Sequence, residues 1–386
     1  MSDPKISVIM PVYNSEQYLA ESLNSFMAQT LQDIEIICVD DGSEDSSLMI
    51  LKEYHEKDKR IKVLSQINQG AGPARNKGML IAQGEYICFL DSDDFYPNSD
   101  TLEKLYIKAI QNKALICGGS FSDFTVSGEL NTNYDQEMFW GYTFKEEGWI
   151  EYRDYQFDYG YHRFLYDRDM LIQYNIFFPC LRRFQDPPFF VQAMVQAGRF
   201  YAIPEVTYRY RSVDKTVLIQ TSKEKTRDLL LGLSMNLEFA QKNNLQRLFD
   251  LTVKRCIRNY NKVFIAATEM NDDEINTILS KLNIIASEVN TDHPNVFFQM
   301  QITNEVLEKK NRAFQNEIIA LQNKVSVLQN DIAHVHNSIS FRIGRSLTWL
   351  PRKVCSGMRY CREHEAGYIF HRMLYYIGVW KDEGNG

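Results

Sequence analysis

Long apolar runs are missing from this chain of 386 residues. None approaches the ~18 to 20 residues that a helix needs to cross a bilayer, so we expect no transmembrane segment. The first residues also lack a charged segment followed by a long apolar stretch, so we expect no secretory signal. The seven cysteines are odd in number, scattered, and include no CxxC pair. A reduced, cytoplasmic compartment is the simplest interpretation.

Positive charge is not in excess either. The formal net charge is -7, so we expect no general affinity for nucleic acid. With 44% hydrophobic and 24% charged residues, the composition is that of a folded chain and excludes a disordered, collagen-like or low-complexity protein. At roughly 150 residues per domain, the length predicts two to three structural units.

The first hundred residues alternate between apolar runs and helical spacing. We predict strands at 6–11, 34–39, 61–64 and 86–90, and helices at 15–29, 46–55 and 73–83. Strands that alternate with helices indicate right-handed βαβ units and a mostly parallel, doubly wound sheet. The strands are apolar throughout, as expected for a sheet that is covered on both faces. The fold class is therefore α/β.

Four regions follow from the changes of pattern along the chain: 1–220, a helical segment at 221–299, a heptad segment at 300–339, and a tail at 340–386. The heptad has mostly β-branched residues at a and leucine at d, which favours a parallel two-stranded coil and a homodimer. The alternative is a long amphipathic helix packed on its own domain. The d positions are Met300, Leu307, Phe314, Leu321, Leu328 and Val335, and the a positions are Asn304, Asn311, Ile318, Val325, Ile332 and Ile339.

The tail differs from the rest of the chain in charge. Residues 341–386 contain eight Lys or Arg and four Asp or Glu, a net charge of +4. Its basic residues alternate with aromatic and aliphatic ones, which is typical of a helix that lies in the interface of an anionic membrane. The alternative is docking on a partner chain or on the catalytic domain.

Polar residues follow three of the predicted strands. Ligands of an open parallel sheet bind beyond the carboxyl ends of its strands. The acids that follow the fourth strand alternate along an extended chain, and carboxylates together with phosphate oxygens suit Mn²⁺ or Mg²⁺. Such an ion would make a diphosphate a better leaving group. The three segments are Pro11-Val12-Tyr13-Asn14, Asp40-Asp41-Gly42-Ser43 and Asp91-Ser92-Asp93-Asp94.

A glycine-rich segment, 70–78, opens the third predicted helix. It is neither a Walker A loop nor a GxGxxG fingerprint. It would let the backbone approach a ligand, with Arg75 facing a phosphate or a base. The alternative is that the glycines serve turn geometry alone.

The segments ISVIMPVYN, VDDGSEDSS, GAGPARNKG and FLDSDD together resemble the family 2 inverting glycosyltransferases, which share the GT-A fold, over about residues 5–215. The resemblance implies a nucleotide-sugar donor, most commonly a UDP-sugar. It implies a metal on Asp93, with Asp91 near the ribose or sugar and Arg75 at the nucleotide. The other donor-binding residues that it implies are Pro11, Val12, Tyr13, Asn14, Asp40, Asp41 and Ser92. Of these, Pro11, Val12, Tyr13 and Asp41 are implied to hold the nucleobase, with Asp40 next to Asp41.

The same resemblance implies a general base in a later acidic motif, which matches Asp186. Gln185 replaces the usual glutamate beside it. A base opposite the leaving group fits inversion by a single displacement; the alternative for Asp186 is a helix cap. Arg209 and Arg211 alternate on one strand face and are implied to lie near the diphosphate, or else to form surface ion pairs. His162 lies where relatives build the acceptor site, although a lone histidine is more often structural.

The resemblance therefore predicts a transferase that acts on a hydroxyl of a glycan acceptor. The tail, which is similar to C-terminal extensions of bacterial surface-polysaccharide transferases, favours a lipid-linked acceptor and a peripheral location at the inner face of the cell membrane. Two alternatives stay open. One is a protein-glycosylating transferase. The other is a catalytically inactive scaffold that binds a nucleotide-sugar, and the absence of an acidic residue at Gln185 is the feature that favours it.

Overall fold

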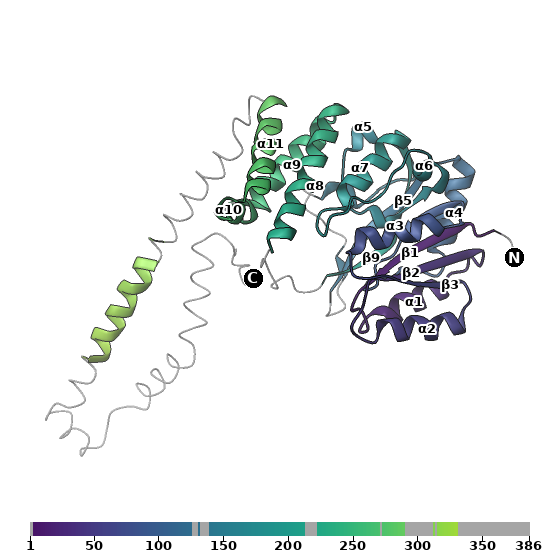
Figure 1. Ribbon diagram of the computed structural model, residues 1–386, viewed down its shortest axis with the longest axis horizontal. Coiled ribbons are helices and arrows are strands. Elements are labelled where there is room, and N and C mark those ends of the chain that lie inside the picture. The colour runs from purple at the N-terminus through teal and green to yellow at the C-terminus, as the bar shows by residue number, and fades with distance from the viewer. Residues whose placement is uncertain are drawn as a thin grey trace, which may run out of the picture. The chain divides into compact units, whose positions relative to one another are not determined.

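The computed structural model of the chain describes residues 3–125, 130–131, 139–212, 222–270, 272–289, 312 and 315–330 (Figure 1). Its contacts divide the chain into one compact unit, Met1–Thr303, and a second, Asn304–Gly386. Within the second unit the described part of the heptad segment, 315–330, is helical, and the tail at 340–386 lies outside the described residues. None of the described helices is both long enough and apolar enough to span a membrane.

A single mixed sheet forms the centre of the first unit. The order of its strands is β3-β2-β1-β4-β8-β5-β9-β7, with β6 paired to β5. The first four strands in that order run parallel, β8 is antiparallel to both of its neighbours, and β9 is parallel to β5. The strands are β1 (Ile6–Val12), β2 (Ile34–Asp40), β3 (Ile61–Ser65), β4 (Tyr86–Phe89), β5 (Ile116–Thr125), β6 (Leu130–Asn131), β7 (Gly148–Glu151), β8 (Phe164–Asp167) and β9 (Arg199–Ser212).

The predicted α/β architecture is confirmed, and the four predicted strands are present with their ends shifted by one residue. Both β1 and β2 are buried along their whole length, because helices cover both faces of the sheet. One face carries α1 (Leu19–Met27), α2 (Ser47–Lys57) and α4 (Thr101–Asn112). The other carries α3 (Ala71–Ile81), α5 (Tyr152–Tyr155), α6 (Arg168–Gln173) and α7 (Asp186–Ala197).

Two predicted helices begin elsewhere than expected, for local reasons. α1 starts at Leu19 rather than at Ser15, because residues 16–18 form a turn in which the Tyr18 N–H donates to Ser15 O at 3.0 Å. α3 starts at Ala71, two residues before Pro73. Proline is tolerated in a first turn, since the N–H it lacks has no partner within the helix there.

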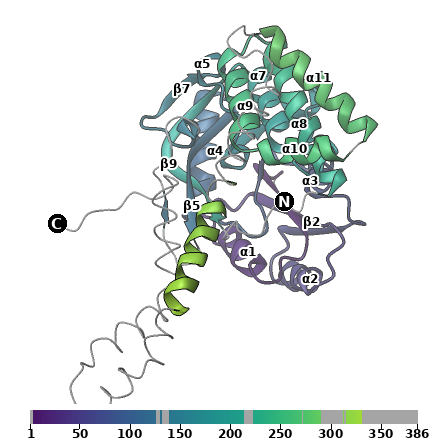
Figure 2. The ribbon, with the colours of Figure 1, turned by 90° about the vertical axis from the view of Figure 1, so that its left-hand side faces the viewer.

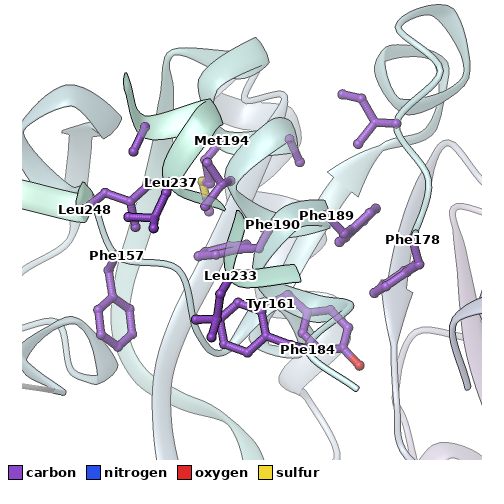
Figure 3. Close-up of a cluster of buried hydrophobic side chains, with 14 of the residues drawn as sticks. Phe157, Tyr161, Phe178, Phe184, Phe189, Phe190, Met194, Leu233, Leu237 and Leu248 are labelled. Carbon is purple, nitrogen blue, oxygen red and sulfur yellow. The ribbon is translucent and has the colours of Figure 1, made fainter. Parts of the chain in front are cut away.

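Four further helices occupy the predicted helical segment: α8 (Lys223–Lys242), α9 (Gln246–Arg258), α10 (Asn261–Glu269) and α11 (Asp273–Val289). They lie together at one end of the sheet unit (Figure 2). Their apolar side chains belong to the same core as those of β1, β4 and α7. In Figure 3, Leu233 and Leu237 of α8 lie near Phe190 and Met194 of α7. The helical segment and the sheet are thus one packed unit.

Candidate active site

The predicted strand-end residues converge at one edge of the sheet. β1 lies between β2 and β4, so the chain order reverses beside β1, which is where open α/β sheets bind ligands. The loops after these strands are tied together, because Ser15 Oγ lies 2.6 Å from Ser92 Oγ. Asn14 has a φ of +48°, and its Oδ1 accepts from Glu44 N at 2.8 Å. Asparagine adopts that left-handed conformation more readily than most residues.

The residues implied to hold the nucleobase divide into a buried and an exposed group. Pro11 and Val12 end β1 and are buried, whereas the Tyr13 side chain is 47% exposed and faces solvent at the edge. Asp40 is buried and its Oδ1 accepts from Ser43 N at 3.2 Å. The Tyr13 ring is therefore open to a ligand, whereas the buried Asp40 carboxylate stabilises the turn at Ser43.

Asp41, which is predicted to bind the nucleobase, also stabilises a turn of the protein itself. Its carboxylate is buried and accepts from Gln66 Nε2 at 2.8 Å, from Gln69 N at 2.9 Å and from Gly70 N at 2.7 Å. Gly70 is the residue before α3 and has a φ of +96°. This conformation favours glycine. Asp41 thus fixes the turn that starts the helix carrying Arg75.

Arg75 is the residue that joins the parts of the site. Its guanidinium is buried, donates to Asp91 Oδ1 at 2.7 Å and lies 3.4 Å from Asp186 Oδ1. The rings of Tyr161 and Phe178 each lie 5.2 Å from its centre, so the cation has aromatic faces beside it. Arg75 thereby connects the loop after β4 to the start of α7.

The two carboxylates on Arg75 differ in pKa. Burial raises the pKa of Asp186 to about 6, against the opposing effect of Arg75, while Asp91 adds to the increase. Burial also acts to raise the pKa of Asp91, but the charge of Arg75 and the hydrogen bonds from Arg75 and Tyr161 hold that pKa below its usual range. The side chain of Asp186 is 40% exposed and that of Asp91 is 25% exposed, so Asp186 is the more open of the two to a ligand.

Gln185 takes part in the same network. The surrounding groups orient its amide so that the oxygen accepts from Arg75 Nη1 at 3.2 Å and the nitrogen donates to Leu181 O at 2.8 Å. The side chain is only 8% exposed. A neutral amide here leaves Asp186 as the single carboxylate at the start of α7, and it still supports the arginine.

The acids after β4 have separate surroundings. Asp94 is buried, and it accepts from Tyr208 Oη and from Arg211 N, each at 2.7 Å. Burial and then the charge of Asp91 raise the pKa of Asp93. Because Asp94 and Asp91 are already engaged, Asp93 is the acid of this loop that remains for a cation.

A divalent ion fits this loop with help from a ligand. In the described ranges, no three His, Cys, Asp or Glu side chains gather as a metal site. Burial, and after it the closely spaced negative charge, raises the pKa values of Asp93 and Asp94, and a cation would offset that charge. An ion held here by Asp93 would take its other ligands from water and phosphate oxygens, as Mg²⁺ commonly does.

Arg211 forms hydrogen bonds with the acidic loop after β4, residues 91–94. Its Nε donates to Asp93 O at 2.8 Å, and its guanidinium pairs with Glu21 and lies 4.5 Å from the ring of Tyr18. Arg209 is half-buried, and its backbone exchanges hydrogen bonds with Phe95 at 3.1 and 3.3 Å. For both arginines, contact with a diphosphate stays a prediction.

A cavity of about 430 Å³ opens beside Asp186. His162 lines it, and burial lowers the pKa of this histidine to about 3, so the ring is neutral. The lining also contains Arg255, Asn259 and Tyr260, which were not predicted from the sequence and which α9 and the two residues after it supply. A buried arginine on an otherwise apolar helix face was the available signal.

These features define an α/β fold of the GT-A class, with an acidic edge and an arginine between two carboxylates. Among solved structures, Staphylococcus aureus TarS 1-349 in complex with UDP-GlcNAc matches with a TM-score of 0.57 and 24% identity, over 74% of this chain and 82% of that one. At this identity, the likeness concerns the fold. A family model, Glycosyl transferase family 2, matches residues 7–174.

The chain is also similar in sequence to bacterial glycosyltransferases. Putative glycosyltransferase EpsH of Bacillus subtilis is 32% identical over 252 residues, 63% of this chain and 71% of the relative. EpsJ of the same organism, an uncharacterized glycosyltransferase, is 35% identical over 54% of this chain. An uncharacterized glycosyltransferase of Haemophilus influenzae is 46% identical over 33% of it. This chain spans 61% and 51% of the lengths of the last two. The chain belongs to glycosyl transferase family 2.

Proposed function

We propose that this chain transfers a sugar, with inversion, from a UDP-sugar to a hydroxyl of a glycan acceptor, assisted by Mn²⁺ or Mg²⁺. The observation that carries the proposal is the pairing of Asp91 and Asp186 with the two terminal nitrogens of buried Arg75. This geometry supports a donor on the β4 side and an acceptor on the α7 side. Membership of the family supports the reaction class.

Asp186 is the proposed general base. With a pKa of about 6, it is mostly ionised at neutral pH and still basic enough to accept a proton. The acceptor oxygen forms its bond to the anomeric carbon as the bond to the diphosphate oxygen breaks, and the acceptor proton moves to Asp186. One base and no second nucleophile give inversion in a single displacement.

The donor is proposed to lie along the strand ends. Tyr13 offers an exposed ring for the base, and Asp41, directly after β2, is proposed to bind the same base, with Asp40 next to it. TarS has been solved with UDP and with UDP-GlcNAc, and this supports uridine as the base here. Asp93 would hold the divalent ion, whose charge would stabilise the leaving diphosphate. Asn14, Ser92, Arg209 and Arg211 complete the proposed donor site.

The acceptor is proposed to be a lipid-linked surface glycan. The basic, aromatic tail at 341–386 supports attachment to an anionic membrane, where such an acceptor would be found. The alternative of a silent scaffold is weakened, because Gln185 keeps a contact to Arg75 and Asp186 is retained. A peptide acceptor is tested by competition against glycan acceptors.

The test is release of nucleoside diphosphate from UDP-, GDP-, CDP- and dTDP-sugars, with Mn²⁺ and with EDTA. We expect metal-dependent turnover of one donor, lost in Asp93→Ala. Asp186→Asn should lower transfer to an acceptor by about 10² to 10⁴. Asp169→Asn serves as the control, because Asp169 is 83% exposed on α6. If no nucleotide binds with any metal, the proposal fails.

A further inference from the structure

One tyrosine of β9 contacts the acidic loop after β4 on both sides of Asp93, the proposed metal ligand. The Tyr208 hydroxyl donates to Asp94 Oδ2 at 2.7 Å, although the two residues are 114 positions apart in the sequence. The same hydroxyl accepts from the N–H of Asp91 at 3.1 Å. A single side chain thus connects the residue two positions before Asp93 to the residue directly after it.

Arg211, three residues further along β9, makes a second connection to this loop. Its N–H donates to Asp94 Oδ1 at 2.7 Å, and its Nε donates to the carbonyl of Asp93 at 2.8 Å. Between the two, the backbone of Arg209 exchanges hydrogen bonds with that of Phe95 at 3.1 and 3.3 Å. The acidic loop therefore takes its position from the end of β9.

The Tyr208 side chain is itself held by packing. It is fully buried, in the apolar cluster that also contains Leu90 and Phe121. The centre of the His162 ring lies 3.8 Å from the centre of the Tyr208 ring. A side chain that packing locks in one rotamer holds its hydrogen-bond partners more precisely than a mobile one does. The hydroxyl therefore occupies a fixed position beside the loop.

Asp94 and Asp93 differ in what surrounds them. Asp94 is 1% exposed, and each of its carboxylate oxygens accepts from a different residue of β9. Buried polar groups are almost always satisfied in this way, and the two donors fix the carboxylate from both sides. Asp93 is only half-buried. Asp94 thus anchors the loop and leaves Asp93 for the ion.

A divalent ion at this loop would have few protein ligands, so the position of each one matters. Within the described ranges, no three His, Cys, Asp or Glu side chains gather as a metal site. An ion on Asp93 would take its other ligands from water and from the phosphates of the donor. Other parts of the donor site place those phosphates, so Asp93 must be held at a matching distance from them.

We propose that Tyr208 and Asp94 are positioning residues, which set the affinity for the divalent ion by holding Asp93 in place. The inference rests on the proposed function and adds to it two residues outside the proposed donor-binding and metal-binding set. Partners that orient a metal ligand typically change metal affinity by about 10- to 100-fold when they are replaced.

The test measures the Kd for UDP by calorimetry on the full chain, with one fixed concentration of Mn²⁺ and with EDTA. The ratio of the Kd in EDTA to the Kd with Mn²⁺ reports how strongly the ion and the nucleotide favour each other's binding. Tyr208→Phe removes a hydroxyl and no charge. The ratio should fall about tenfold or more in this variant, while the Kd in EDTA changes by less than about twofold.

Tyr201→Phe is the matched control. Tyr201 lies near the start of β9, and its hydroxyl donates to Glu147 Oε1 at 2.7 Å, away from the acidic loop. The ratio should be unchanged in this variant. In transfer assays of Tyr208→Phe, the Mn²⁺ concentration for half-maximal rate should rise about 10- to 100-fold, and excess Mn²⁺ should restore kcat.

Asp94→Asn tests the other half of the contact. Asparagine keeps the shape of the side chain, but its amide nitrogen cannot accept the hydroxyl proton of Tyr208. The double variant should therefore weaken Mn²⁺ binding no further than Asp94→Asn alone, because both changes break the same hydrogen bond. Losses that multiply would show that the two residues act independently and would overturn the proposal.

The remaining outcomes separate this inference from the proposed function. If UDP binds the unaltered chain equally well with Mn²⁺ and with EDTA, the metal role of Asp93 has failed first. If Mn²⁺ strengthens UDP binding by the same factor in the unaltered chain and in Tyr208→Phe, the positioning role is wrong and the proposed function stands. Thermal unfolding of each variant distinguishes a weakened metal site from a lost fold.

Discussion

Arg75 lies between the carboxylates of Asp91 and Asp186 and acts to lower the pKa of each. The pKa of Asp91 ends below its usual range, whereas that of Asp186 ends above it. Asp91 accepts a hydrogen bond from Arg75 at 2.7 Å and stays ionised, whereas Asp186 at 3.4 Å retains a pKa of about 6. Charged hydrogen bonds weaken with distance, so the closer acid is stabilised more strongly as an anion. One arginine thus supports an acid that stays charged and another that can take up a proton.

This difference predicts the pH profile of the reaction. Asp186 must be ionised to accept the proton of the acceptor, so kcat/KM should fall about tenfold per pH unit below its pKa of about 6 and reach a plateau above it. Arg75 lowers that pKa, so Arg75→Gln should move the acid limb to higher pH. A profile that is flat between about pH 5 and 8 would contradict the role of Asp186.

Single residues of the site were predictable to different degrees. Asp91, Asp93 and Arg75 follow predicted strands or open a predicted helix, so topology alone places them at one edge. The second role of Asp41, as the anchor of the Gly70 turn, depends on loop contacts with Gln66 and Gln69 that no periodicity encodes. Arg255 was missed because its partner is 97 residues away in the sequence.

Among the elements, α8 approaches the loop before α7 closely at a glycine, Gly232. A Cβ on Gly232 would lie 2.7 Å from Phe184 O and 2.9 Å from its Cδ1, and Phe184 has a φ of +62° two residues before Asp186. The absence of a side chain at 232 thus permits the close approach of helix and loop.

Gly232→Ala is therefore expected to displace the start of α7. A shift of about 1 Å at the base can cost about 10² in rate, so kcat should fall by ten- to a hundredfold. Overpacking should also lower stability by about 1–3 kcal/mol. Lys242→Ala, at the exposed end of the same helix, is the control. Unchanged kcat by steady-state kinetics would show that the loop can yield without moving Asp186.

The heptad segment was predictable from spacing, and its described part is helical. We propose that it pairs with a second copy through its a and d positions. Val325, at a, is 41% exposed in the single chain, and Val327, at c, is 58% exposed. Val325→Asp should convert a dimer to a monomer in sedimentation, because it puts a charge in the seam, whereas Val327→Asp should not. Equal behaviour of the two variants would argue against a coiled-coil dimer.

At the scale of the molecule, the first strands were predictable because each is a continuous apolar run. The second half of the sheet was not, because the aromatic residues between 140 and 200 follow neither period. They form the core between sheet and helices. Phe178 and Phe189 stack with their ring centres 4.0 Å apart (Figure 3). The ring centres of Phe164 and Phe190 lie 5.3 Å apart. Their order in the chain says little about which rings meet.

The buried pair of Asp158 and Arg255 links the two halves of the first unit. Arg255→Met would leave Asp158 buried and unpaired, at a cost of about 3–5 kcal/mol in the free energy of unfolding. Adding Asp158→Asn should recover most of that loss, because no lone charge remains. Urea unfolding measures both, and Lys108→Ala, from a partly exposed pair with Glu147, should change little. Additive losses in the double variant would contradict the pairing.

The core shared by the sheet and α8–α11 bears on how such a chain can change over generations. Ile9 of β1 and Ile285 of α11 belong to the same apolar cluster. Recombination that exchanged residues 222–289 for those of a relative would replace many of the packing partners in that cluster and could remove the arginine that pairs with Asp158. A new acceptor preference would therefore not be gained by exchanging this segment alone. Point substitutions at exposed Asn259 leave the core intact. Divergence in substrate choice would then proceed by small steps on the rim of one cavity.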